Sequence, residues 1–131
     1  IISHGIQVST TILNKQVLQT GYSMIHGAYS SIGKISTSAT CLEGLIASFS
    51  FITTDNTIKN SILSSIPVGI KFLIRAQVID GEHVGGFTGI IPSSPPEQLD
   101  EDQMHLRSEI QIDNVQHSLS ALLGYLDIIS Q

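Results

Sequence analysis

Charged residues are scarce in this chain, where they make up 13% of 131 residues, about half the share of an average soluble domain. The shortage does not indicate disorder, because disordered chains combine high charge with low hydrophobicity, and 41% of this chain is hydrophobic. A surface with so little charge is weakly protected against association. The composition therefore predicts one globular domain over residues 1–131, with part of its surface covered by a partner or by sister copies.

Basic residues are the rarest of the charged ones. Six Lys and Arg stand against eleven Asp and Glu, which gives a formal net charge of −5, and tryptophan is absent. The six cations are scattered along the sequence, so no basic patch can neutralise several phosphates. We therefore expect no nucleic-acid partner.

The chain also lacks paired cysteines and long apolar runs. Its single cysteine, Cys41, cannot form an internal disulfide, and we expect this thiol to behave as a small buried hydrophobe. No apolar run reaches the ~20 residues of a membrane span, and the longest, residues 42–52, is interrupted by Glu43 and Gly44. We expect no stable membrane span. No signal peptide is visible, although the start at Ile1 leaves open that a leader or precursor segment was removed.

What the sequence does contain is a seven-residue rhythm between Leu18 and Phe49. Alternate steps of three and four meet only apolar residues or glycine, which is typical of a helix that buries one stripe. We predict a helix over residues 17–41 whose stripe alternates large and small side chains, so that another backbone can approach closely. The stripe packs either within its own chain or against a second copy. As an interface it comprises Ile25, Ala28, Ile32, Ile35 and Ala39.

A β-hairpin is predicted downstream of this helix. Residues 69–79 alternate between two faces, Asp80-Gly81 is the preferred pair for a two-residue type I′ turn, and residues 82–91 return the chain. Two further segments fit a strand period, namely residues 42–54 and, as a short strand or extended arm, residues 1–16.

Three shorter helices complete the predicted fold. Asp55 or Asn56 caps a helix that should end at Ile66, because Pro67 disfavours helical geometry in the residue before it. Ser94 caps a helix over residues 95–109. The last helix covers residues 114–130, with apolar residues at heptad spacing: Val115, Leu119, Leu122, Leu126 and Ile129.

Together these elements predict an α+β fold. It combines a long helix rich in small residues, a central antiparallel hairpin or sheet, and a C-terminal helical segment.

No motif that carries chemistry stands out. The five histidines lack the spacing of a ligand set such as HExxH. The acidic cluster after Pro96 is typical of a helix N-terminus and lacks the pattern of a calcium loop. The glycines between Gly85 and Gly89 open no helix and form no phosphate-binding loop. We therefore assign no catalytic residue, metal or cofactor from the sequence.

Two segments resemble parts of a known family. Residues 67–78 resemble the strand after the central helix of hotdog-fold acyl-thioester hydrolases and dehydratases, and residues 24–28 resemble the start of that helix. The resemblance implies that His26 and Gly27 lie near a thioester carbonyl, with Asp55 or Glu43 as the base. The C-terminal helical segment departs from the hotdog fold, which ends in strands.

The sequence thus favours a non-enzymatic structural or self-assembling protein that forms a homo-oligomer through its small-residue helical seam. The alternative is a hotdog-like acyl-thioester hydrolase or dehydratase, or a small-molecule binder. A role on a membrane surface is least favoured, because residues 17–41 lack the Lys/Arg-rich face of an interfacial helix.

Overall fold

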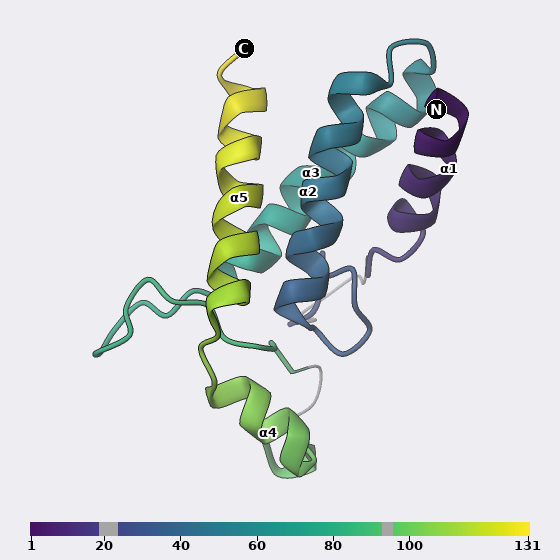
Figure 1. Cartoon of the computed structure of the whole chain (residues 1–131). Coiled ribbons are helices and arrows are strands. Elements are labelled where there is room, and N and C mark those ends of the chain that lie inside the picture. Colours follow the sequence, from purple (N-terminus) through teal and green to yellow (C-terminus); the bar gives the residue numbers. More distant parts are fainter. Residues whose placement is uncertain (19–23, 93–95) are drawn as a thin grey trace.

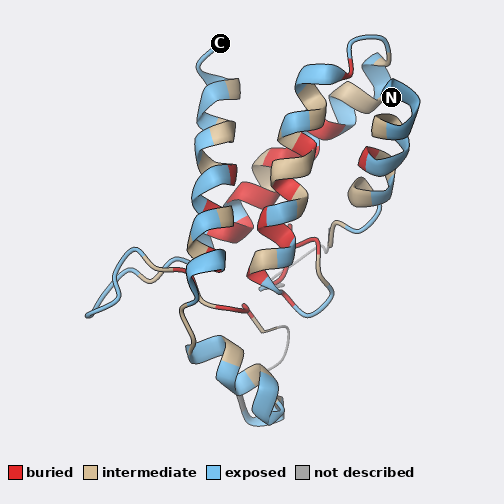
Figure 2. Cartoon of the chain, in the orientation of Figure 1, coloured by how far each residue is buried: buried red, intermediate tan, exposed pale blue. Residues whose placement is uncertain are grey.

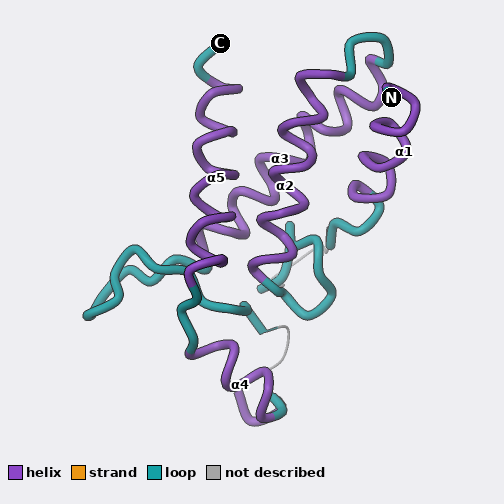
Figure 3. Tube along the Cα trace, in the orientation of Figure 1, coloured by secondary structure: helices purple, strands orange, loops and turns teal. Residues whose placement is uncertain are grey.

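The computed structural model describes residues 1–18, 24–92 and 96–131 (Figure 1). These residues form helices joined by loops, with isolated antiparallel bridges but no sheet (Figure 3). The predicted α+β fold is therefore wrong, and the chain is helical. Its elements are α1 (Ile2–Leu13), α2 (Ile35–Phe51), α3 (Asn56–Arg75), a 3-10 turn η1 (Pro96–Gln98), α4 (Glu101–Ser108) and α5 (Ile112–Ile129).

The helices are arranged around the pair α2 and α3. Helix α1 packs on one side of this pair and α5 on the other, mainly against α2 (Figure 1). The core lies where α2 and α3 face each other (Figure 2). Its buried side chains come chiefly from these two helices: Ile35, Ala39, Leu42 and Leu45 of α2, and Ile62, Ile66, Ile70, Phe72 and Leu73 of α3.

The helix predicted over residues 17–41 is present only from Ile35 onward. Residues 24–34 form turns instead, with Gly27 at φ +92° and Gly33 at φ +69°. A Cβ on Gly33 would lie 1.9 Å from the Ile91 carbonyl oxygen, so this position requires glycine for both conformation and space. Gly27 and Gly33 therefore lie in turns and not in a helix. Residues 17–18 are not helical either, and the other residues of the prediction, 19–23, lie outside the described residues.

The strands predicted at residues 1–16 and 42–54 are also wrong, since these segments fall mainly in α1 and α2. Their apolar residues alternate with polar ones, and this period favoured strand. In α1 a Ser or Thr hydroxyl fits the helix by bonding the carbonyl one turn back, as Thr10 Oγ1 does to Ile6 O at 2.8 Å. Burial of one face of each helix then outweighs the weak local preference for strand.

Helix α3 replaces the first strand of the predicted hairpin. Its N-cap is Asp55 as expected, with Oδ1 accepting from the Ile58 N–H at 3.1 Å. The helix does not end at Ile66 but continues through Pro67 to Arg75. Burial of Ile66, Ile70 and Leu73 along one face stabilises the helix across the proline.

Only a small antiparallel loop remains of the hairpin, bridged at Gln77 and Phe87. Among the described residues only glycines have positive φ, so Asp80 cannot take its place in a type I′ turn.

The C-terminal helical segment is present, with different boundaries. Ser94 lies outside the described residues. The capping box belongs instead to Asp100, whose Oδ1 accepts from the Gln103 N–H at 2.8 Å. The helix expected over residues 114–130 is α5, which begins at Ile112.

Candidate functional site

The predicted interface residues lie mostly inside a single chain. Four of the five are buried in the core, with exposed fractions of 5% for Ile25 and 0% for Ala28, Ile35 and Ala39. A second copy cannot touch these four side chains unless the fold opens. Ile32 alone keeps an exposed fraction of 43%, and its contact with another copy stays a prediction.

The structure gives other roles to the residues that the hotdog resemblance implicated. Asp55 caps α3, and Glu43 of α2 pairs with His117 of α5 at 2.7 Å. The carbonyl of His26 accepts a hydrogen bond from Arg75. A hotdog fold also needs a sheet, and the described residues form none. The resemblance therefore has no structural basis.

The remaining candidates for chemistry among the described residues are a metal site and the Cys41 thiol. Among the described residues, no cluster of three or more His, Cys, Asp or Glu could hold a metal ion. Cys41 is half-buried, and burial raises the pKa of its thiol, with a smaller opposing effect from Lys15. A raised pKa leaves little thiolate at neutral pH, so this cysteine is a poor nucleophile.

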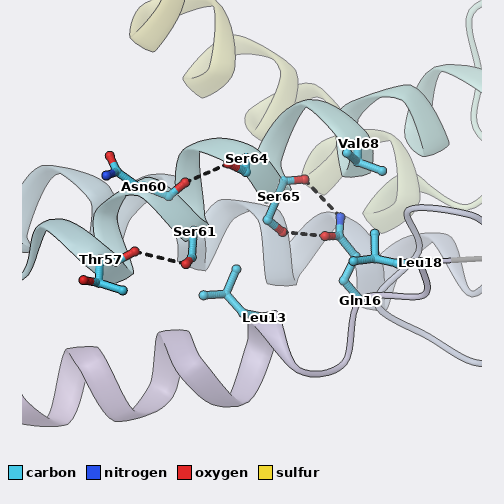
Figure 4. A pocket seen from close by; sticks show the side chains of 9 residues that line it. All are labelled: Leu13, Gln16, Leu18, Thr57, Asn60, Ser61, Ser64, Ser65 and Val68. Atoms are coloured by element: carbon cyan, nitrogen blue, oxygen red, sulfur yellow. Dashed lines mark hydrogen bonds between the residues drawn. The ribbon is translucent and has the colours of Figure 1, made fainter.

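A buried polar network links the segment after α1 to α3 (Figure 4). The Ser65 hydroxyl donates to Gln16 Oε1 at 2.8 Å, and Gln16 Nε2 donates back to the Ser65 carbonyl at 3.0 Å. Because the single Ser65 hydroxyl proton is used in this way, the Tyr29 hydroxyl must donate to Ser65 Oγ. Burial raises the pKa of Tyr29 to about 12. The network is neutral and fully paired, which suits it to holding loops rather than moving protons.

This network borders a shallow groove of about 630 Å³. The groove has no charged lining residue, and two of its hydroxyls are already used within α3: Ser61 donates to the Thr57 carbonyl and Ser64 to the Asn60 carbonyl, each at 3.0 Å. With these donors satisfied, the groove offers few groups that could orient a ligand. Its lining comprises Leu13, Gln16, Leu18, Thr57, Asn60, Ser61, Ser64, Ser65 and Val68 (Figure 4).

The residues of α5 that are most fully buried in its contact with α2 are small or polar. Ser118 and Ala121 are fully buried, and a Cβ on Gly124 would lie 2.9 Å from Ile46 Cγ2. Asn114 is 2% exposed, and neither its Nδ2 nor the Ser118 Oγ has a hydrogen-bond partner among the described residues. The close approach of backbones that the sequence placed in residues 17–41 thus occurs at α5, within one chain.

The opposite side of α5 carries large apolar side chains that face solvent. They are exposed by between 51% and 85% of their surface, and no other helix among the described ranges exposes more than two such residues. Helical spacing places four of them within about 60° of one another around the helix, and Ile129 lies at the edge of this face, in heptad register with Val115 and Leu122. We call this set the α5 outer face; it comprises Ile112, Leu119, Leu123, Leu126 and Ile129.

The sequence indicated part of the α5 outer face. The heptad spacing of the last helix includes Leu119, Leu126 and Ile129, but periodicity alone cannot say whether a stripe faces the core or solvent. The side chains from the same helix that pack on the core are Val115, Leu122, Tyr125 and Ile128.

Comparison with protein-family models, with curated proteins and with solved structures found no match to this chain. None of the helices in the described part of the chain is both long enough and apolar enough to cross a membrane.

Proposed function

We propose that this chain is a structural, self-associating helical protein whose copies pack together through the α5 outer face. The observation that carries the proposal is the number of large apolar side chains that α5 leaves exposed, in addition to those that it packs on the core. This helix buries Asn114 and Ser118 against its own chain while it exposes five large apolar side chains. Contiguous exposed apolar surface of this kind is typical of an interaction site.

The size of the exposed face supports a dimer of moderate affinity. Full burial of a Leu or Ile side chain stabilises by about 1.5–3 kcal/mol, and these side chains are already partly covered. Covering five of them on each of two copies would contribute on the order of 8–15 kcal/mol, against an association cost of roughly 4–15 kcal/mol. A micromolar dissociation constant, which we expect, requires a net gain of about 8 kcal/mol, and the upper part of the burial range supplies it at the lower part of the association cost.

A second copy fits this face better than a charged partner does. The five residues of the α5 outer face are uncharged, and the only acidic residues of α5 are Asp113 and Asp127. Asp127 lies one turn after Leu123 on the exposed side of the helix, so an anionic partner is disfavoured, and the large apolar side chains are covered best by other apolar side chains.

The double variant Leu119→Asp, Leu123→Asp tests this proposal. Each substitution would place a charge in the proposed interface, so we expect the variant to be monomeric at concentrations where the wild-type chain dimerises. The matched control is Gln7→Asp, Thr11→Asp, which adds the same charge at the same spacing to exposed polar positions of α1, on the other side of the α2 and α3 pair. Sedimentation velocity over a concentration series measures both. Equal association of the two variants would contradict the proposal.

A further inference from the structure

Helix α5 carries an unbroken heptad repeat of large apolar residues that its own chain leaves largely uncovered. The residues follow one another at alternate steps of three and four along the whole helix, the spacing at which two helices pack side by side. Four of the six are exposed by between 51% and 85% of their surface, and the other two are only partly buried. We call this set the α5 heptad face; it comprises Ile112, Val115, Leu119, Leu122, Leu126 and Ile129.

The α5 heptad face is not the side of the helix that holds α2. The residues buried most deeply against the chain's own core are Asn114, Ser118 and Ala121, and they lie about 100° around the helix from the centre of the heptad face. Each helix of a four-helix bundle contacts two neighbours with adjacent sides in this way. A second helix can therefore pack along the heptad face without any opening of the fold.

The acidic side chains of α5 decide where a second copy can pack. Asp127 lies beside Leu123, so a contact centred on Leu123 would take a carboxylate of each copy out of water at a cost in free energy. Both Asp127 and Asp113 lie more than about 90° from the centre of the heptad face. A contact along the heptad face therefore leaves both carboxylates of α5 in water, and Leu123 is covered at its edge.

The area of the heptad face suits a helix of the same length. The repeat extends over about 26 Å of helix, and its exposed side chains offer on the order of 300 Å² of apolar surface on each copy. With its flanking residues, such a contact stays below the roughly 1,200 Å² in total that a standard-size interface buries, and small interfaces of this kind are weak. This area agrees with the micromolar dissociation constant expected above.

We propose that the second copy covers this side of α5 with its own α5, which runs antiparallel to the first about a two-fold axis. This inference rests on the proposed function, because it specifies which surface of the second copy makes the contact. A two-fold interface needs a surface that is complementary to itself, and in one register every residue of the heptad face meets an apolar residue of the other copy. The facing pairs, each of which occurs twice, are Ile112 with Ile129, Val115 with Leu126, and Leu119 with Leu122.

The charges near one end of α5 favour the antiparallel orientation. The loop over residues 77–87 and the segment that contains η1 and α4 both lie at the N-terminal end of α5 (Figure 1). The only Lys or Arg in these two segments is Arg107, and their acidic residues are Asp80, Glu82, Glu97, Asp100, Glu101, Asp102 and Glu109. A parallel pair would bring the acidic segments of two copies together. An antiparallel pair separates them by about the length of α5, which exceeds the screening length of about 8 Å at physiological salt.

Disulfide capture tests the orientation and the register together. In a Cys41→Ser background, chains carrying Ile112→Cys are mixed with chains carrying Ile129→Cys, one of them extended by a tag so that heterodimers and homodimers separate on a non-reducing gel. The two positions lie about 26 Å apart along the helix, so a disulfide joins them only where opposite ends of two helices meet. We expect the covalent heterodimer to exceed either homodimer by at least about tenfold. The matched control replaces Ile129→Cys with Thr54→Cys, an exposed position in the loop between α2 and α3.

Two results of the capture experiment would overturn the inference. Preferential homodimers would mean that the two helices are parallel, and capture no greater than that of the control would mean that another surface is in contact. In either case the proposal that the α5 outer face makes the dimer still depends on Leu119→Asp, Leu123→Asp alone.

A charge-pair experiment tests the same register without cysteine. Ile112→Lys, Ile129→Glu places opposite charges across an antiparallel pair, whereas Ile112→Lys, Ile129→Lys places like charges there. We expect the first variant to dimerise at least about tenfold more tightly than the second in sedimentation velocity, because each dimer contains two such pairs. Equal dissociation constants would overturn the inference. If the wild-type chain stays monomeric, both this inference and the proposed function fail.

Discussion

Gly33 marks the turn that leads into α2, and it does so through backbone geometry alone. Its φ of +69° lies in the left-handed region, and a Cβ there would lie 1.9 Å from the Ile91 carbonyl oxygen. We predict that Gly33→Ala lowers the free energy of unfolding by at least about 3 kcal/mol, because conformational strain of roughly 1–2 kcal/mol adds to a backbone clash. Urea unfolding measures the change.

Gly81 offers the matched control. Its φ of +88° is similar, but a Cβ there would meet no atom within 4 Å. Gly81→Ala should therefore cost only the conformational term, about 1–2 kcal/mol. Equal losses for the two variants would show that the contact with Ile91 is not what requires glycine at position 33.

The buried Tyr29 hydroxyl should make the free energy of unfolding depend on pH in the alkaline range. Burial raises the pKa of this hydroxyl in the folded chain to about 12, from its ordinary value of 10.0. Between these pH values the unfolded chain releases the proton first, so this group's contribution is complete below pH ~10 and is lost as the pH rises toward ~12. We expect unfolding experiments at pH 9 to 12 to show a steeper loss of stability for the wild type than for Tyr29→Phe. Parallel curves for the two proteins would contradict this assignment.

At the scale of elements, the sequence predicts the helix α5, but it does not predict that all of α2 is helical. The α5 sequence places apolar residues at helical spacing with few strand-favouring neighbours. The α2 sequence contains Ser, Thr, Ile and Phe in an alternating order that fits a strand equally well. This segment is helical because the helix buries Ile35, Ala39 and Leu42 against α3. Local sequence does not encode such a contact between distant segments. The prediction that the helix ends before Pro67 failed for the same reason, because tertiary packing stabilises α3 across the proline.

The candidate site was predictable only in part, and for a related reason. The sequence indicated a seam of small residues and a self-associating surface, but it assigned the seam to residues 17–41. Small residues are common both in turns and at close contacts between helices. Only the fold shows that Gly33 lies in a turn and that Gly124 packs closely against Ile46. The exposure of Leu123 depends on which side of α5 meets α2, and that choice is made by the packing of whole helices.

The contact between α2 and α5 gives a prediction for this pair of elements. Ser118 is fully buried, and its hydroxyl has no hydrogen-bond partner among the described residues. Ser118→Ala removes the desolvated hydroxyl and should raise the free energy of unfolding by about 1 kcal/mol more than Ser120→Ala does. Ser120 is exposed on the same helix, so its variant reports helix propensity alone. An equal or smaller gain for Ser118→Ala, measured by denaturant unfolding, would mean that the buried hydroxyl is satisfied.

At the scale of the whole molecule, the helices cover one another unevenly. Helices α2 and α3 are enclosed by α1 on one side and α5 on the other (Figure 1). Helix α5 has nothing of the described chain over its outer face, where its large apolar side chains are exposed. This face would be covered in the proposed dimer.

The central claim is that the 131-residue chain associates with itself through this face. The most direct test is its molar mass by sedimentation equilibrium from sub-micromolar to ~100 μM, a range that brackets the micromolar dissociation constant expected above. The predicted result is a rise from 14.1 kDa toward twice that value, abolished by Leu119→Asp, Leu123→Asp. A mass that stays at 14.1 kDa across the whole range would contradict the claim.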